Sequence, residues 1–276
     1  MAHGNQPTVL RYGGCTLRLK WHKLRRAPDD PPFARSNLQA GLQAGASLEV
    51  DLQLLACGRF VCLHDARLEG ETTGSGPVSA IDADAVARLE MLATPGAPPL
   101  LLDELVEIVR TSPRADSARV QLDLKNTAAE IGDAVCRTFA ATVGALSDCF
   151  ILSGCDWDAA TRLGGDVPGL ALGYDPTDDP AISPAEVLAL VRARAAEADT
   201  IYLDRNVVRA AQERGEPLVA RLRDDGHHVD CWTIDHGTTA ATADLLAAVA
   251  AGCDQITTNS ARAWTAAGPG LEQAIS

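Results

Sequence analysis

The chain has 276 residues, 46% of them hydrophobic, which is enough to bury one large core. Its formal net charge of −13 argues against a nucleic-acid partner, because phosphate-backbone binding normally leaves a basic stripe on the surface. There is no run of 18 or more apolar residues, and the first residues lack the pattern of a secretion signal. We therefore expect one domain over residues 1–276, cytoplasmic and without stable membrane insertion.

Apolar runs of strand length alternate with helical patterns along the chain. The predicted strands, in order, cover residues 15–22, 47–55, 119–126, 149–154, 169–174, 200–204, 228–234 and 254–259. The predicted helices lie between them, at residues 34–46, 82–91, 101–110, 129–144, 157–165, 183–198, 207–226 and 238–252, and a last helix ends the chain. A small hairpin follows the second strand, where residues 59–65 pair back across the turn at residues 56–58.

This alternation predicts an α/β fold with a parallel sheet and right-handed crossovers, and eight such units fit a closed (β/α)8 TIM barrel. A doubly wound open sheet is the alternative. No GxGxxG motif follows the first strand, which disfavours the usual dinucleotide-binding form of that sheet.

Polar residues gather where the predicted strands end. In chain order they are His22; Glu49 and Asp51; Asp123 and Lys125; Ser153; Tyr174; Asp204; Trp232 and Thr233; and Thr258 and Asn259. In a barrel the carboxyl ends of all strands open at one mouth, and barrel enzymes have their active sites there. The pattern therefore predicts a single site.

Two acids lie inside an apolar strand of this pattern, in the stretch SLEVDLQLL. Glu49 and Asp51 are two residues apart, so their side chains face the same way. Two such carboxylates repel each other unless a cation offsets their charge, and Asp123 supplies a third oxygen ligand. An all-oxygen set suits Mg²⁺ or Ca²⁺, so we expect one divalent cation at Glu49, Asp51 and Asp123. The alternative, in which Glu49 and Asp51 form the solvent face of an amphipathic strand, fits poorly with parallel barrel strands that are covered on both sides.

Two histidines are placed to work beside this cation. His22 ends the first strand, and His64 follows the hairpin in the stretch CLHD. Such a pair can divide general acid and general base catalysis, one removing a proton while the other protonates the leaving group. The alternative for each is an ordinary surface or hydrogen-bonded core histidine.

The ordered motifs WHK, LEVDLQ, CLHD, LDLK, WTID and GCDQITTNSARA resemble the glycerophosphodiester phosphodiesterase family of phospholipase C-like TIM barrels. The likeness runs from about Thr16 to Ala263. It implies a phosphoric diester hydrolase of lipid metabolism that cleaves glycerophosphodiesters to sn-glycerol 3-phosphate and an alcohol headgroup. It also implies a Glu49, Asp51 and Asp123 metal site, with His22 and His64 as the acid–base pair.

The same resemblance implies attack by a neighbouring substrate hydroxyl, which gives a cyclic phosphate that water then opens. Lys23 and Lys125 are expected to contact the substrate, and Lys125 adds a compact positive charge near the phosphoryl oxygens. Trp232 is expected to form an apolar wall that can stack on a cationic headgroup; a buried aromatic at the barrel top is the alternative.

Four positions depart from the family pattern. Lys23 stands where the family has arginine, so bidentate phosphate binding is lost unless Arg25, Arg26 or Arg35 reaches the site. Ser36 lacks the carboxylate expected in that segment, Asp123 is one methylene shorter than glutamate, and Asp235 replaces an asparagine.

Two other functions remain open. A phospholipase C- or D-like enzyme that cuts lipids or lysophospholipids would favour an apolar or aromatic rim, yet only 4% of the residues are aromatic. A non-catalytic barrel that binds phosphorylated metabolites would not need both histidines. We expect a small-molecule substrate in either enzymatic case, and the oligomeric state stays open.

Overall fold

The structure is a computed structural model that describes residues 6–12, 14–177, 179 and 181–271, the side chains of 268–271 excepted. Residues 1–5 and 272–276, the two ends of the predicted domain, lie outside the described residues. Within the described part of the chain, none of the helices combines the length and the apolar character needed to span a membrane.

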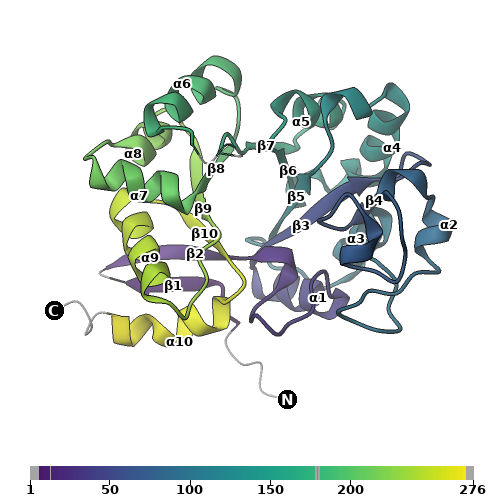
Figure 1. The fold of residues 1–276 in the computed structure, drawn as a ribbon, viewed down its shortest axis with the longest axis horizontal. Coiled ribbons are helices and arrows are strands. Elements are labelled where there is room, and N and C mark those ends of the chain that lie inside the picture. The colour runs from purple at the N-terminus through teal and green to yellow at the C-terminus, as the bar shows by residue number, and fades with distance from the viewer. Residues whose placement is uncertain (1–5, 13, 178, 180, 272–276) are drawn as a thin grey trace.

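Among the described residues, eight parallel strands form a closed barrel surrounded by helices, which confirms the predicted TIM barrel (Figure 1). The barrel strands are β2 (Cys15–Trp21), β3 (Ser47–Leu54), β5 (Arg119–Leu124), β6 (Phe150–Gly154), β7 (Ala171–Tyr174), β8 (Thr200–Asp204), β9 (His228–Trp232) and β10 (Gln255–Thr258). Pairing of β2 with β3, through Lys20 opposite Ser47 and Trp21 opposite Leu48, closes the sheet.

The helices cover the outer face of this barrel. They are α1 (Arg35–Ala44), α2 (Ala83–Val86), α3 (Leu102–Thr111), α4 (Asp133–Val143), α5 (Trp157–Gly164), α6 (Pro184–Arg194), α7 (Arg205–Glu213), α8 (Leu218–Asp224), α9 (Thr239–Ala251) and α10 (Ala261–Leu271). Short 3-10 helices are η1 (His22–Leu24), η2 (Leu68–Gly70), η3 (Val78–Ala80), η4 (Ala128–Glu130) and η5 (Gly144–Cys149).

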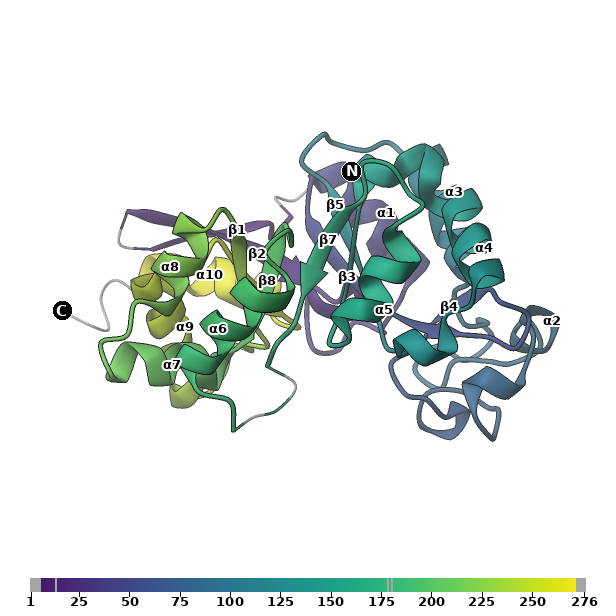
Figure 2. The ribbon, with the colours of Figure 1, turned by 90° about the horizontal axis from the view of Figure 1, so that it is seen from above.

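The barrel is divided into two sides, and both views agree on them. Strands β3 to β7 lie with helices α1 to α5, whereas β8 to β10 and the N-terminal β1 and β2 lie with α6 to α10 (Figures 1 and 2). The sides meet along the brief pairings of β2 with β3 and of β7 with β8, which Gly173–Thr200 and Tyr174–Ile201 form. The mouth of the barrel is therefore framed by both halves of the sequence.

Alternation along the strands decides what faces the helices and what faces the barrel axis. In β5 the apolar Val120, Leu122 and Leu124 are buried in the core between sheet and helices. The residues between them, including Gln121 and Asp123, point to the other face, because successive strand side chains alternate. The result is a barrel with an apolar outer layer and a polar interior.

The site strand β3 follows directly from the end of helix α1. Gly45 ends α1 in the left-handed region with φ 72°, which glycine adopts without the steric cost of a side chain. Ala46 then donates its N–H to Gly41 O, and β3 starts at Ser47. This abrupt turn sets the register of the strand that carries Glu49 and Asp51.

Three elements differ from the sequence prediction. Strand β1 (Val9–Tyr12), which pairs antiparallel with β2, was missed because its four residues have no clear alternation. The predicted helix 207–226 is two helices, α7 and α8, because Gly215 with φ 68° and Pro217 interrupt it. The predicted helix 82–91 shrinks to α2.

The hairpin after β3 is present as predicted. Strand β4 (Phe60–Cys62) pairs antiparallel with β3, and the chain then makes a loop-rich excursion before α3. His64 lies two residues after the end of β4, so the hairpin returns its side chain to the carboxyl end of the barrel.

Candidate active site

A cavity of about 290 Å³ opens at the carboxyl ends of the barrel strands. It is lined by His22, Glu49, Asp51, His64, Gln121, Asp123, Lys125, Cys155, Asp175, Tyr202, Trp232, Thr233 and Thr257. The structure thus brings seven of the predicted site residues together: both histidines, all three acids, Lys125 and Trp232. Lys23 is the exception, since it lines a neighbouring cavity instead.

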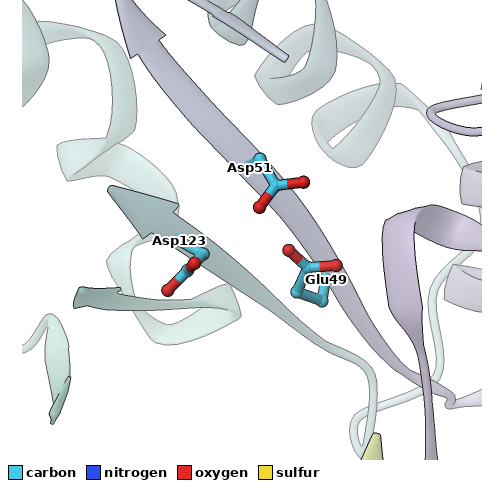
Figure 3. A group of neighbouring side chains, drawn as sticks. All are labelled: Glu49, Asp51 and Asp123. Atoms are coloured by element: carbon cyan, nitrogen blue, oxygen red, sulfur yellow. The ribbon is translucent and has the colours of Figure 1, made fainter. Parts of the chain in front are cut away.

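The three acids converge on one point. Glu49 and Asp51 extend from β3 and Asp123 from the adjacent β5, where Asp123 stands opposite Asp51 (Figure 3). One carboxylate oxygen of each lies within 4.8 Å of the others. Burial, together with the charges of Asp51 and Asp123, raises the pKa of Glu49 well above its usual range. Asp51 Oδ2 is buried without a hydrogen-bond partner. A cluster of buried oxygens with an unsatisfied acceptor fits a divalent cation.

Lys125 offsets part of this charge. Its ammonium contacts Asp51 Oδ1 at 2.7 Å and also binds Asp123. Burial lowers the pKa of Lys125, but the nearby carboxylates outweigh burial and raise it above its usual range. Burial likewise raises the pKa of Asp123, yet Lys125 and the Ser153 hydrogen bond hold it below the usual value. Both groups are therefore ionised at neutral pH.

Lys23 contacts two of the acids, although it does not itself line the cavity that they line. Its backbone is in the left-handed region with φ 52°, an uncommon conformation for a residue with a side chain. In this conformation the Lys23 N–H donates to Glu49 Oε2 at 2.6 Å, and its ammonium lies 3.6 Å from Asp51 Oδ2.

Two of the three arginines that could take the place of the family's arginine at position 23 bind acidic residues instead. Arg26 binds Asp30, and Arg35 forms an ion pair with Glu104. Arg25 lines the neighbouring cavity with Lys23, and its Nε is buried without a hydrogen-bond partner. Positive charge at the cavity itself therefore comes mainly from Lys125.

His22 is held by an amide whose orientation is fixed. Asn259 donates from Nδ2 to Asp235 Oδ2 at 2.9 Å, so its Oδ1 must face His22 Nδ1, 3.1 Å away. The Nδ1 of His22 then carries the proton, and Nε2 presents a lone pair on the side of Glu49, whose Oε2 lies 4.0 Å away. Burial, opposed mainly by Asp51, lowers the pKa of His22 to about 4, so its ring is neutral at pH 7.

His64 is exposed and is oriented differently. Asp65 accepts a hydrogen bond from His64 Nδ1 at 2.9 Å, which leaves Nε2 free to meet a ligand. Glu71 fixes the turn, because its Oε2 accepts the backbone N–H groups of both His64 and Asp65.

The remaining walls contain Asp175 and Gln121, which the sequence analysis did not assign, and Trp232, which it did. Asp175 follows β7 and lines the cavity; burial raises its pKa to about 7 although Thr177 donates to it. Gln121 lies two residues before Asp123 on the same strand face, a spacing that the sequence shows. Trp232 lines the cavity as predicted, and its indole Nε1 is buried without a hydrogen-bond partner.

Comparison with known proteins places this geometry in a recognised fold. No family model and no curated protein matches the chain. Among solved structures, a glycerophosphodiester phosphodiesterase from Parabacteroides distasonis matches with a TM-score of 0.69 at 15% identity, over 91% of this chain and 96% of the other. The chain has the glycerophosphodiester phosphodiesterase fold.

Two further structures support that statement. An Agrobacterium tumefaciens glycerophosphodiester phosphodiesterase matches with a TM-score of 0.65 at 20% identity, over 92% of this chain and 99% of the other. An Oleispira antarctica phosphodiesterase, solved in complex with the product sn-glycerol-3-phosphate, matches with a TM-score of 0.67 at 18% identity, over 94% and 96%. The resemblance predicted from the motifs is thus confirmed for the fold.

Proposed function

We propose that this protein is a metal-dependent phosphodiesterase that cleaves glycerophosphodiesters to sn-glycerol 3-phosphate and an alcohol headgroup. One observation carries the proposal: three convergent carboxylates, two of them buried and one half-buried, line the same cavity at the barrel mouth as two differently held histidines. The likeness of the fold to glycerophosphodiester phosphodiesterases supports it. The Oleispira antarctica structure adds support, since that phosphodiesterase holds glycerol phosphate as its product.

Glu49, Asp51 and Asp123 would hold one divalent cation, Mg²⁺ or Ca²⁺. When bound, such a cation supplies Lewis-acid stabilisation of the negative charge that develops on the phosphoryl oxygens. Two features of the acids themselves favour a cation there: Asp51 Oδ2 is buried without a hydrogen bond, and the pKa of Glu49 is raised by burial and by the neighbouring carboxylates.

His22 is proposed as the general base. Because Asn259 keeps the proton on Nδ1, the Nε2 lone pair is available to take a proton from the attacking hydroxyl. If that hydroxyl belongs to the substrate glycerol, its attack on phosphorus closes a cyclic phosphate and expels the headgroup oxygen. Water then opens the ring in a second step.

His64 is proposed as the general acid. Its Nδ1–H is bound to Asp65, so a protonated ring can donate from Nε2 to the departing headgroup oxygen. Lys125 adds positive charge beside the phosphoryl group, and the ring of Trp232, which lines the cavity, can pack against the headgroup.

A substrate panel tests the proposal. Glycerophosphodiesters with different headgroups, and lysophospholipids as the lipid alternative, are incubated with Mg²⁺ or Ca²⁺, and cyclic and open phosphates are separated. We expect metal-dependent release of headgroup from the glycerophosphodiesters. Turnover of lysophospholipids alone would favour the lipid phosphodiesterase, and binding without turnover of any substrate would favour the non-catalytic barrel.

A further inference from the structure

A charged pair is buried in the barrel directly beneath the cavity. The ammonium of Lys20 lies 2.8 Å from Asp230 Oδ2, and the two side chains are 1% and 0% exposed. Barrel interiors are usually filled with branched apolar side chains. Burying two ions costs several kcal/mol each, and apolar replacements are often as stable or more so. Stability alone therefore gives no reason for this pair.

Each member of the pair is surrounded by further partners. Asp230 accepts a hydrogen bond from Thr257 Oγ1 at 2.8 Å and another from Gln255. The Lys20 ammonium lies 4.2 Å from the centre of the Tyr202 ring and donates to Gln121 Oε1. An ammonium has only three protons, so these contacts fix its direction.

From Lys20 the hydrogen bonds run in one direction only. Because Gln121 Oε1 accepts from Lys20, its Nε2 faces the opposite way and donates to Ser153 Oγ at 2.8 Å. The Ser153 hydroxyl has one proton and donates it in a hydrogen bond to Asp123 Oδ1 at 2.7 Å. Every donor in this series points toward Asp123, and no member can reverse without leaving a buried polar group unpaired.

The series also explains how a short acid can serve at this position. Ser153 stands opposite Asp123 in the neighbouring strand β6, and its hydrogen bond occupies Oδ1. With Oδ1 held from below, Oδ2 is turned toward Lys125 and the other acids. Gln121 precedes Asp123 by two residues on the same face of β5, so the strand that carries Asp123 also carries part of this support.

We propose that the buried Lys20–Asp230 pair positions Asp123 as a metal ligand, through one-way hydrogen bonds across Gln121 and Ser153. The inference rests on the proposed function, in which Asp123 binds the cation. Lys20, Asp230, Gln121 and Ser153 are positioning residues. Loss of such outer partners typically weakens metal binding by about 10- to 100-fold.

Two variants test the proposal. Ser153→Ala deletes the hydroxyl that donates to Asp123 Oδ1 at 2.7 Å and leaves in place the Lys20–Asp230 pair and the longer 3.5 Å bond from Gln121 Nε2 to the same oxygen. The double variant Lys20→Met/Asp230→Leu removes both buried charges together. Dissociation constants for Mg²⁺ and for Ca²⁺ are measured by titration calorimetry, and melting temperatures are recorded. We expect both variants to bind the cation about 10- to 100-fold more weakly, with the double variant melting at or above the wild-type temperature.

A matched control removes another pair with a buried acid away from the site. Arg209 of α7 binds Asp244 of α9, whose side chain is 4% exposed. The variant Arg209→Met/Asp244→Leu is expected to keep the wild-type metal affinity.

The outcomes separate the two proposals. Wild-type affinity in Ser153→Ala, with the cation bound by the parent protein, refutes the positioning series and leaves the proposed function standing. A parent protein that binds neither cation refutes the metal assignment and the positioning series together. If the double variant does not fold, Ser153→Ala still decides.

Discussion

Substituting Asp235 by the asparagine that the family pattern has at this position should lower the proposed phosphodiesterase activity. Asp235 Oδ1 accepts from the Asn259 N–H at 2.6 Å and from the Thr258 hydroxyl at 3.1 Å, while Oδ2 accepts from Asn259 Nδ2. A carboxylate offers acceptors on both sides, whereas an amide offers one oxygen and one NH₂ group. In Asp235→Asn one donor must therefore face another donor.

The new amide oxygen is expected to take the place of Oδ1, where it keeps two donors, the Asn259 N–H and the Thr258 hydroxyl. The new NH₂ group then takes the place of Oδ2, and the bond from Asn259 Nδ2 is lost. Asn259 must then turn, and its Oδ1 leaves His22 Nδ1. A hydrogen bond to a charged group contributes about 1.5–3 kcal/mol. If that energy holds His22 in its working orientation, kcat falls by about 10- to 100-fold while KM changes little.

The assay is steady-state turnover of the best substrate in the panel, with Asp225→Asn as control. Asp225 is also an aspartate held by hydrogen bonds, from Arg192, but it lies on the surface. Circular dichroism melting checks that both variants fold. A kcat for Asp235→Asn within twofold of wild type would refute the reasoning that Asp235 orients His22 through Asn259.

Three other outcomes follow from the site. His22→Ala and His64→Ala should each lower kcat by about 10²- to 10⁴-fold. His64→Ala should keep the wild-type melting temperature, because the His64 side chain is exposed. Unchanged turnover in both variants would refute the acid–base assignment. Chelation should abolish activity and added Mg²⁺ or Ca²⁺ restore it, so activity indifferent to chelator would contradict the carboxylate site. Burial raises the pKa of Asp175 in the folded protein to about 7, above its unfolded value, so the free energy of unfolding of the wild type should fall from about pH 4 to pH 7. In urea unfolding, Asp175→Asn should be more stable than wild type by about 2 to 4 kcal/mol at pH 7.5 and equally stable near pH 4. Equal stability of the two proteins at both pH values would refute the pKa shift.

The fold could be predicted from the sequence because each barrel strand has its own apolar run. The eight strands were found at nearly their observed bounds, since residues such as Val120 and Leu122 recur at every second position. Strand β1 could not be predicted, because Val9–Tyr12 gains its order by pairing with Cys15–Arg18 rather than from its own pattern. Helix α7 ends at Glu213, just before Gly215 and Pro217. Both helix breakers are visible in the sequence, but the predicted helix 207–226 continued across them.

The sequence predicts the part of the site that follows from spacing and motifs within single strands, and not the contacts between residues far apart in the chain. Glu49, Asp51 and Asp123 were identifiable from their spacing and motif context, and their convergence agrees with neighbouring strands. The support beneath them joins residues far apart in the sequence, such as Lys20 with Asp230, and no pattern within one strand announces such a pair. The roles of Asn259 and Asp65 likewise depend on which ring nitrogen each contacts, which only coordinates reveal.

Charge at the mouth explains why two lysines accompany three acids. Glu49, Asp51 and Asp123 together with Lys23 and Lys125 leave one net negative charge when all are ionised. A phosphodiester carries one negative charge, so this cluster alone repels its proposed substrate. A divalent cation converts the excess to one positive charge, which the phosphodiester then neutralises. Without the lysines the same cation would leave the cluster negative. In the proposed function, the two lysines would therefore give the metal-loaded cluster the net positive charge that attracts a phosphodiester, even where Lys23 never touches it.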